Sequence, residues 1–396
     1  MAETAAGDGR RARLASARRI VVKVGTHVVT HEGRELALGR LMQVVEGLAR
    51  LRRSGRETIL VTSGAVAMGM QALGIAERPR SLGMRQACAA VGQGRLMAVY
   101  SRALGELGLT AAQVLLTQED LADRDRALCL RTTLMRLLEL GVVPVLNEND
   151  SVSVRELVEY RRANGAPEPG PAGFGDNDGL SARVAVAVDA DLLVLLTDVD
   201  GLHTGNPASD PAAVRVSLLP EVSDEALEWA RGSSGGGTGG MASKLEAAAL
   251  AAAGGTAVLI ASGREPGVLD RALAGDDVGT LVPPAARRPA HLRQIAVAAP
   301  RRGALVIDEG ALAALREGKR SLLPVGVVGV EGVFSRGDVV EVRDGSGRVH
   351  ARGLVNYDAA DCRALAGRKS HEIDRVLGFR TNDALINRHN LALGAL

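Results

Sequence analysis

Short, almost wholly apolar runs alternate with longer helical stretches over the first 280 residues of this 396-residue chain. Each run has four or five residues, mainly Val, Leu and Ile, as in strands that are buried on both faces of a sheet. The alternation is typical of an α/β domain in which helices flank a mostly parallel sheet. The expected strands cover residues 20–24, 58–61, 113–116, 142–146, 192–196 and 257–261.

Helical spacing fills the segments between these strands. The expected helices cover residues 36–54, 81–107, 123–140, 181–188 and 244–253, of which 81–107 is one long helix or a broken pair. Gly55, Gly141 and Gly254 stand where helices commonly end. The Pro- and Gly-rich segment 162–175 reads as a mobile surface loop, whereas the glycine-rich segment 232–240 is either a linker or a binding loop.

The composition changes near residue 283. Short β-type runs separated by Gly, Asp and Pro turns follow, which predicts a small barrel-like β domain. The expected runs cover residues 295–298, 304–307, 325–330, 339–342 and 349–355. We therefore divide the chain into a flexible tail 1–17, an α/β domain 18–283, a β domain 289–380 and a C-terminal tail 381–396.

Lysine is rare: 44 of the 48 basic residues are Arg. Arg replaces Lys freely on a solvated surface but not where a compact ammonium must fit a tight site, so the four lysines carry information. Lys23 lies inside an apolar strand and needs a negative partner, either a core carboxylate or a phosphoryl group. Lys244 stands at a glycine-rich helix start, whereas Lys319 and Lys369 lie in polar segments that we expect to be solvated.

Polar and glycine residues gather where the expected strands end. In an open α/β sheet these carboxyl ends form the ligand site, and five polar turns on one sheet edge outline a single site. Helix capping and Asx turns are the alternative explanation for each Asn and Asp taken alone. The turns are residues 25–26, 62–65, 147–150, 176–178 and 197–198.

Glycines at three helix starts would let backbone N–H groups approach a phosphate or carboxylate closely; they are Gly25, Gly64 and the pair Gly239–Gly240. The last of these is not a P-loop, because Leu245 follows Lys244 where Ser or Thr is required. No G-x-G-x-x-G follows a strand with an acidic residue at the end of the next strand, and the protein-kinase motifs are absent.

Metal and cysteine chemistry have little support in the sequence. His27, His31 and His203 lack ligand spacing, so we expect no metal site in the protein itself. Cys88, Cys129 and Cys362 are isolated from one another, and we expect buried reduced thiols. The chain has no apolar run of about 18 residues, and residues 1–19 lack the apolar centre of a secretory signal, so we expect no membrane association and a cytoplasmic location.

Taken together, six motifs resemble the glutamate 5-kinases of the amino-acid kinase family. They are VKVGT at 22–26, VTSGA at 61–65, VLNEND at 145–150, GDND at 175–178, LTD at 196–198 and GTGGMASK at 237–244. The motifs SLLP at 321–324 and FSRGD at 334–338 resemble the PUA domain that many members carry. The resemblance implies a three-layer α/β/α sandwich followed by a barrel-like PUA domain.

This resemblance implies transfer of the ATP γ-phosphoryl group, with Mg²⁺, to the side-chain carboxylate of L-glutamate, the first step of proline biosynthesis. It implies that Lys23 and Lys244 contact phosphate, that Asp178 orients them, and that Ser63, Asp150 and Asn177 bind substrate. The implied nucleotide site consists of Lys23, Thr197, Asp198, Thr238, Gly239, Gly240, Met241, Ala242, Ser243 and Lys244. A homo-oligomer, feedback inhibition by proline and a glutamyl-phosphate reductase partner are also implied.

The chemistry of the residues agrees with that activity. A glutamate carboxylate has a pKa of about 4.3 and is a nucleophile at neutral pH without a base. What the protein must supply is position and positive charge, which two lysines on opposite sides of the line of transfer would give. One departure is the separation of 26 positions between Asp150 and Asp176, which is longer than the family leads us to expect.

Two alternatives remain open. The first is a kinase of the same fold that acts on another small acid. The second is an RNA-binding or RNA-modifying PUA protein, because residues 287–396 carry 18 basic and 12 acidic side chains. The scarcity of aromatic residues for base stacking argues against the second.

Overall fold

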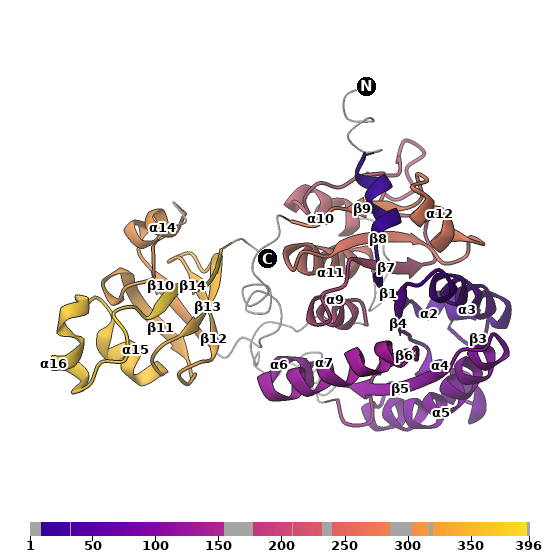
Figure 1. Ribbon diagram of the computed structural model, residues 1–396, viewed down its shortest axis with the longest axis horizontal. Coiled ribbons are helices and arrows are strands. Elements are labelled where there is room, and N and C mark those ends of the chain that lie inside the picture. The colour runs from indigo at the N-terminus through magenta and orange to yellow at the C-terminus, as the bar shows by residue number, and fades with distance from the viewer. Residues whose placement is uncertain are drawn as a thin grey trace. The chain divides into compact units, whose positions relative to one another are not determined.

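The computed structural model of the chain describes residues 9–31, 33–153, 177–207, 209–231, 240–285, 303–316 and 320–393. These residues form two compact units, and apart from residues 122–124 the boundary falls between Ala285 and Ala286 (Figure 1). Both the loop 162–175 and the expected strand 295–298 lie outside the described residues.

The larger unit is built on a seven-stranded sheet with the order β5-β6-β4-β1-β7-β8-β9. All neighbouring strands are parallel except β9, which runs antiparallel to β8. This arrangement confirms the mostly parallel α/β domain. The strands are β1 (Arg19–Val24), β4 (Glu57–Val61), β5 (Ala111–Leu116), β6 (Val143–Glu148), β7 (Leu192–Thr197), β8 (Ala257–Ser262) and β9 (Thr280–Val282).

Helices cover both faces of this sheet (Figure 1). On one face, Val22 and Val24 of β1 pack in a core with α3 and α5, whereas Lys23 contacts Asp178 on α9. The helices are α2 (Thr26–Val29), α3 (Leu38–Arg53), α4 (Ala65–Ala72), α5 (Leu82–Glu106), α6 (Gln118–Ala122), α7 (Arg124–Glu139), α9 (Asn177–Ala187), α10 (Asp224–Arg231), α11 (Met241–Ala253), α12 (Val268–Ala274) and the 3-10 turn η1 (Arg13–Ser16).

The expected helix 81–107 is the single long helix α5, and it crosses α4 at unusually short distance. A Cβ added to Gly92 would lie 1.8 Å from the carbonyl oxygen of Ala65, and one added to Gly69 would lie 1.7 Å from that of Cys88. No side chain other than hydrogen fits at these two positions without moving a helix. The crossing therefore fixes α5 against the start of α4.

The short hairpin of β2 (Thr30–His31) and β3 (Glu35–Leu36) was not expected.

The prediction of a flexible tail over residues 1–17 is wrong for residues 11–17, which pack against the larger unit. Leu14 and Ala17 belong to the core, and the buried Arg11 donates to the carbonyl oxygens of Val278 and Gly279. Its guanidinium also forms an ion pair with Asp277 at 2.9 Å. A polar, Arg-rich sequence hides this packing because only a few apolar side chains anchor it. Residues 1–8 lie outside the described part of the chain.

The smaller unit contains a five-stranded sheet with the order β11-β10-β12-β13-β14. Hydrogen bonds between Leu322 and Ile386 join β14 to the segment that leads into β11, which gives the sheet its barrel-like closure. The elements are β10 (Gly303–Ile307), α14 (Glu309–Arg316), η2 (Pro324–Gly326), β11 (Val327–Gly332), β12 (Val339–Arg343), β13 (Val349–Val355), α15 (Ala359–Leu365), η3 (Ser370–Glu372), α16 (Ile373–Leu377) and β14 (Ile386–Leu393).

The expected tail 381–396 is also wrong, because Ile386–Leu393 form β14 and pair antiparallel with β13. The polar middle of this strand gave no alternating pattern.

The thiols differ from the expectation as well: Cys88 and Cys362 are buried, but Cys129 on α7 is exposed. In the described ranges, no helix combines the length and the apolar character needed to cross a membrane.

Candidate active site

Asp178 holds two lysines that are 221 positions apart in the sequence. Its Oδ1 lies 2.7 Å from Nζ of Lys23, and its Oδ2 lies 3.3 Å from Nζ of Lys244. All three side chains are buried: the exposed fraction is 0% for Asp178, 2% for Lys23 and 5% for Lys244. Charges this deeply buried are stable only when they are paired, so the carboxylate is the group that keeps both ammoniums in place.

Local sequence explains how the three side chains meet. Lys23 is the next-to-last residue of β1, the central strand, and the alternation of the strand directs it away from the Val22 and Val24 core. Asp178 lies in the first turn of α9, and Lys244 lies in the first turn of α11. A parallel sheet brings helix starts to the carboxyl ends of its strands, so these first turns converge.

The expected helix 181–188 begins four residues too late. Helix α9 starts at Asn177, so Asp178 is part of the helix and not of a turn before it. The carboxylate of Asp178 contacts Lys23, Lys244 and the hydroxyl of Ser243, which donates to Oδ2 at 3.2 Å. Pairing of Lys23 with a core carboxylate was one of the two alternatives, and it is correct; the same carboxylate also holds Lys244.

Around Gly25 the main chain comes close to Lys23. The N–H of Gly25 donates to the carbonyl oxygen of Leu196 at 3.0 Å, which ties the turn after β1 to the end of β7. A Cβ at Gly25 would lie 3.8 Å from Nζ of Lys23. Glycine therefore leaves space beside the ammonium group that any other residue would begin to fill.

Asn177 is the centre of a second polar cluster. Its Nδ2 donates to the carbonyl oxygen of Thr62 at 2.8 Å, to Oγ of Ser63 at 2.9 Å and to Oδ1 of Asn147 at 3.0 Å. The cluster joins the turn after β4, the end of β6 and the start of α9. Ser63 and Asn177, both expected to bind substrate, are thus brought into contact with each other.

Sequence reasoning missed two residues of α5 that border this cluster. Oε1 of Gln93 accepts a hydrogen bond from Nδ2 of Asn147 at 2.7 Å, and the hydroxyl of Tyr100 accepts one from Thr62 at 2.9 Å. Tyr100 is fully buried, and this burial raises the pKa of its phenol to about 12. Neither residue had a sequence signal, because both stand in the middle of a long helix, far from any glycine turn.

Asp150 lies half-buried in the turn after β6. The same turn is stiffened by Ser153, which is buried and donates to Oε1 of Glu148 at 2.7 Å. The N–H groups of Val152 and Ser153 both donate to the carbonyl oxygen of Asn149. Asp176, at the far side of the segment that begins at 154, lies outside the described residues.

Of the expected nucleotide residues, Thr238 and Gly239 are outside the described part of the chain. Gly240 is the N-cap of α11, and its carbonyl oxygen accepts from Oγ of Ser243 at 3.0 Å. Met241 and Ala242 follow in the first turn. Thr197 ends β7, and its hydroxyl donates to Oδ1 of the exposed Asp198 at 3.1 Å. Thr197 therefore ends the strand next to β1, which carries Lys23, and Gly240 begins the helix that carries Lys244.

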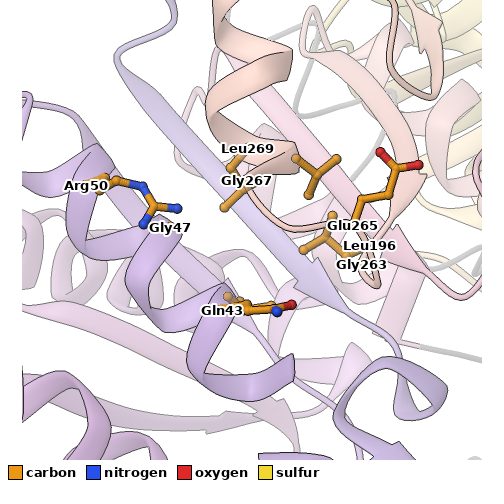
Figure 2. Close-up of a pocket in the computed structure, with 10 residues that line it drawn as sticks. Gln43, Gly47, Arg50, Leu196, Gly263, Glu265, Gly267 and Leu269 are labelled. Carbon is orange, nitrogen blue, oxygen red and sulfur yellow. The ribbon is translucent and has the colours of Figure 1, made fainter. Parts of the chain in front are cut away.

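A small pocket lies on the α3 side of the same sheet edge. Figure 2 shows Gln43 and Arg50 of α3 on one side of it and Glu265, after β8, on the other. Leu196 and Gly263 also line it, next to Thr197, whose carbonyl oxygen accepts from the N–H of Gly263 at 2.8 Å. Its enclosed space, about 10 Å³, holds no more than about one water molecule. None of the residues expected in the active site lines this pocket.

Comparison with known proteins decides the family. The model of the amino acid kinase family matches residues 18–262, which include the whole cluster around Asp178. The chain belongs to the amino acid kinase family. A model of the PUA domain matches residues 303–377, within the smaller unit.

Curated relatives in the same family match almost the full chain. "Glutamate 5-kinase" of Gloeobacter violaceus is 48% identical over 377 residues, which cover 94% of this chain and 98% of the relative. The proteins of the same name from Myxococcus xanthus and Moorella thermoacetica are 47% and 45% identical, over 97% and 96% of this chain and 98% and 97% of their own lengths. The resemblance inferred from the six motifs is confirmed.

Proposed function

We propose that this amino acid kinase transfers the γ-phosphoryl group of ATP to the side-chain carboxylate of L-glutamate, giving L-glutamyl 5-phosphate for proline biosynthesis. The observation that carries the proposal is the buried Lys23–Asp178–Lys244 group. The names of the relatives support glutamate as the substrate.

Two ammonium groups held by one carboxylate can stabilise the negative charge of a phosphoryl group during its transfer. The transferred group carries charge on its equatorial oxygens, and stabilising that charge is most of the work of such an enzyme. The starts of α9 and α11 add N–H groups and the positive ends of two helix dipoles beside the lysines. In this proposal Lys23 and Lys244 contact the phosphates, and Asp178 holds both in position.

The nucleotide would lie across the ends of β7 and α11, with Thr197, Asp198 and the segment Thr238–Lys244 around it. Mg²⁺ would arrive with ATP as part of the substrate and neutralise phosphate charge. Glutamate would place its γ-carboxylate toward the lysines. Ser63 and Asn177 would bind its polar groups, and the carboxylate of Asp150 suits its ammonium group.

No proton acceptor is needed in this reaction, because the γ-carboxylate is ionised at neutral pH. Among the described residues, the groups around Asp178 are accordingly cations, amides and hydroxyls rather than a histidine base. The protein's task is to bring two anions together and to offset their repulsion. We also propose a cytoplasmic homo-oligomer that passes its product to a reductase and responds to proline.

The test uses the purified protein with ATP, Mg²⁺ and hydroxylamine. Hydroxylamine attacks the acyl carbon of an acyl phosphate, so the product is trapped as a hydroxamate and phosphate is released. Hydroxamate formation with L-glutamate, and much less with acetylglutamate or aspartate, is the expected result. A protein that phosphorylates one of those acids, carbamate or a nucleoside monophosphate but not glutamate would contradict the proposal.

A further inference from the structure

We propose that Gln93 is a substrate-binding residue that determines specificity: its Oε1 orients Asn147, and its Nε2 donates a hydrogen bond to the α-carboxylate of the substrate. The inference rests on the proposed glutamate kinase activity and adds to it a residue on α5. The observation behind it is a row of side-chain amides that runs from α9 across β6 to α5.

Backbone groups fix the directions of the two asparagine amides in this row, and Asn147 in turn fixes that of Gln93. Nδ2 of Asn177 donates to the carbonyl oxygen of Thr62, which is only an acceptor. Oδ1 of Asn147 accepts from the backbone N–H of Glu148 at 3.0 Å, which is only a donor. Asn147 therefore presents its Nδ2 to α5, and Gln93 must meet it with Oε1.

The remaining end of Gln93 is then an N–H donor. In the described part of the chain its Nε2 has no acceptor, and the side chain is half-buried beside the Asn147 cluster, so the donor is available to a ligand. Asn147 itself is 2% exposed, and both its Oδ1 and its Nδ2 have hydrogen-bond partners among its neighbours. A donor of this kind favours a carboxylate, because hydrogen bonds to ionised acceptors are the strong ones.

The order of the row indicates which carboxylate Gln93 would bind. Asn177 is adjacent in sequence to Asp178, which holds the two lysines, and Gln93 stands two hydrogen bonds farther along the row. The reacting γ-carboxylate belongs at the lysine end. The α-carboxylate of an extended glutamate belongs at the other end, where Gln93 lies.

The close crossing of α4 and α5 keeps Gln93 in place. Its neighbour Gly92 faces the carbonyl oxygen of Ala65, and a Cβ there would lie only 1.8 Å from that oxygen. Ala65 begins α4, two residues after Ser63. The crossing thus holds Gln93 and Ser63 at a constant separation, which a specificity-determining pair requires.

Two substitutions separate the two roles of Gln93. Gln93→Glu keeps an oxygen for Asn147 but replaces the donor by a second oxygen, which would repel a carboxylate. Gln93→Leu removes both groups. Gln71→Glu is the matched control, because Gln71 is exposed on α4 and makes the same change of charge.

Kinase activity is measured with L-glutamate and with its α-amide, isoglutamine, in which the γ-carboxylate is intact. A hydrogen bond to a charged group corresponds to ~10–100-fold in binding. Gln93→Glu should raise KM for glutamate by at least ~10-fold, with KM for ATP within about twofold of the wild-type value. In Gln93→Leu, the preference of kcat/KM for glutamate over isoglutamine should fall by a factor of the same order.

The preference is a ratio taken on one preparation, so it does not depend on the folded fraction of a destabilised variant. An unchanged preference in Gln93→Leu, with normal glutamate activity in the wild type, would overturn the inference and leave the proposed function standing. A wild-type protein that does not phosphorylate glutamate would overturn both. Gln71→Glu should match the wild type in every parameter.

Discussion

The ammonium group of Lys23 lies 2.7 Å from Oδ1 of Asp178, and neither side chain is more than 2% exposed. The other oxygen of the same carboxylate contacts Lys244. Since one carboxylate holds both cations, its charge is required for the structure of the site as well as for the proposed chemistry.

Asp178→Asn should therefore damage both stability and activity. The amide has the same shape but cannot neutralise two buried ammonium groups, and breaking a buried ion pair costs about 3–5 kcal/mol. We expect a lower free energy of unfolding in urea and a kcat at least ~10²-fold lower. Asp198→Asn, at an exposed carboxylate, is the control for stability. Wild-type stability of Asp178→Asn would show that the pair is not needed to keep the lysines buried.

Gly92→Ala should destabilise the protein and weaken glutamate binding. The new methyl group meets the carbonyl oxygen of Ala65, so α4 and α5 must separate, at a cost of about 1–3 kcal/mol or more. Gly94→Ala on the same helix is the control, since nothing lies within 4 Å of its added Cβ. That variant should gain about 0.5–1 kcal/mol. Thermal unfolding of the two variants measures the difference; equal melting temperatures would be inconsistent with the close crossing.

Among the cysteines, Cys129 should react first with a thiol reagent. It is exposed on α7, whereas Cys88 is buried and burial raises the pKa of the Cys362 thiol to about 12. Because the thiolate is the reactive form, native protein should release one equivalent of chromophore from Ellman's reagent, and denatured protein three. Cys129→Ser should abolish the native reaction. Rapid labelling of Cys362 in the native protein would contradict its buried position.

The contact between Asp277 and Arg11 should make the packing of residues 9–17 sensitive to acid. Burial raises the pKa of Asp277, but hydrogen bonds from Ser217 and Arg215 and the charges of both arginines outweigh it and hold the pKa below its ordinary value. A depressed pKa stabilises the fold above about pH 4, and this contribution is lost as the pH falls through the folded-state value.

Asp277→Asn should consequently be less stable than the wild type at pH 7 by less than about 1 kcal/mol, since the carboxylate is more than half exposed. The difference should shrink as the pH is lowered toward 3. Urea unfolding at a series of pH values measures it. A difference that grows on acidification has the wrong sign for this ion pair.

Much of the fold could be predicted because local sequence patterns mark its elements: apolar runs indicate the strands, and glycines indicate where helices end. All six expected strands of the larger unit form, at nearly the expected positions. The strand β14 was missed because INRHNLAL has a polar middle, and its place in the sheet is decided by pairing with β13, which is distant in sequence. The packing of residues 9–17 was missed for a similar reason: it depends on Arg11 reaching carbonyl oxygens 267 and 268 positions away.

The candidate site was predictable where residues follow strands. Lys23, Ser63, Asn177, Asp178 and Lys244 all stand at strand ends or helix starts, so the general rule for α/β sheets brings them together. Gln93 and Tyr100 do not follow that rule. They reach the site only because two glycines let α5 approach α4, which is a property of packing in three dimensions and leaves no local pattern.

The most direct test of the account is the turnover of Lys244→Arg beside Lys369→Arg, at saturating ATP and glutamate. Lys244 is 5% exposed and contacts Asp178, whereas Lys369 is exposed in the smaller unit. The larger guanidinium keeps the charge but does not fit a site built for an ammonium group. We expect kcat to fall ~10²-fold or more for Lys244→Arg and to stay within about twofold for Lys369→Arg. Equal kcat values for the two variants would contradict the central role of the paired lysines.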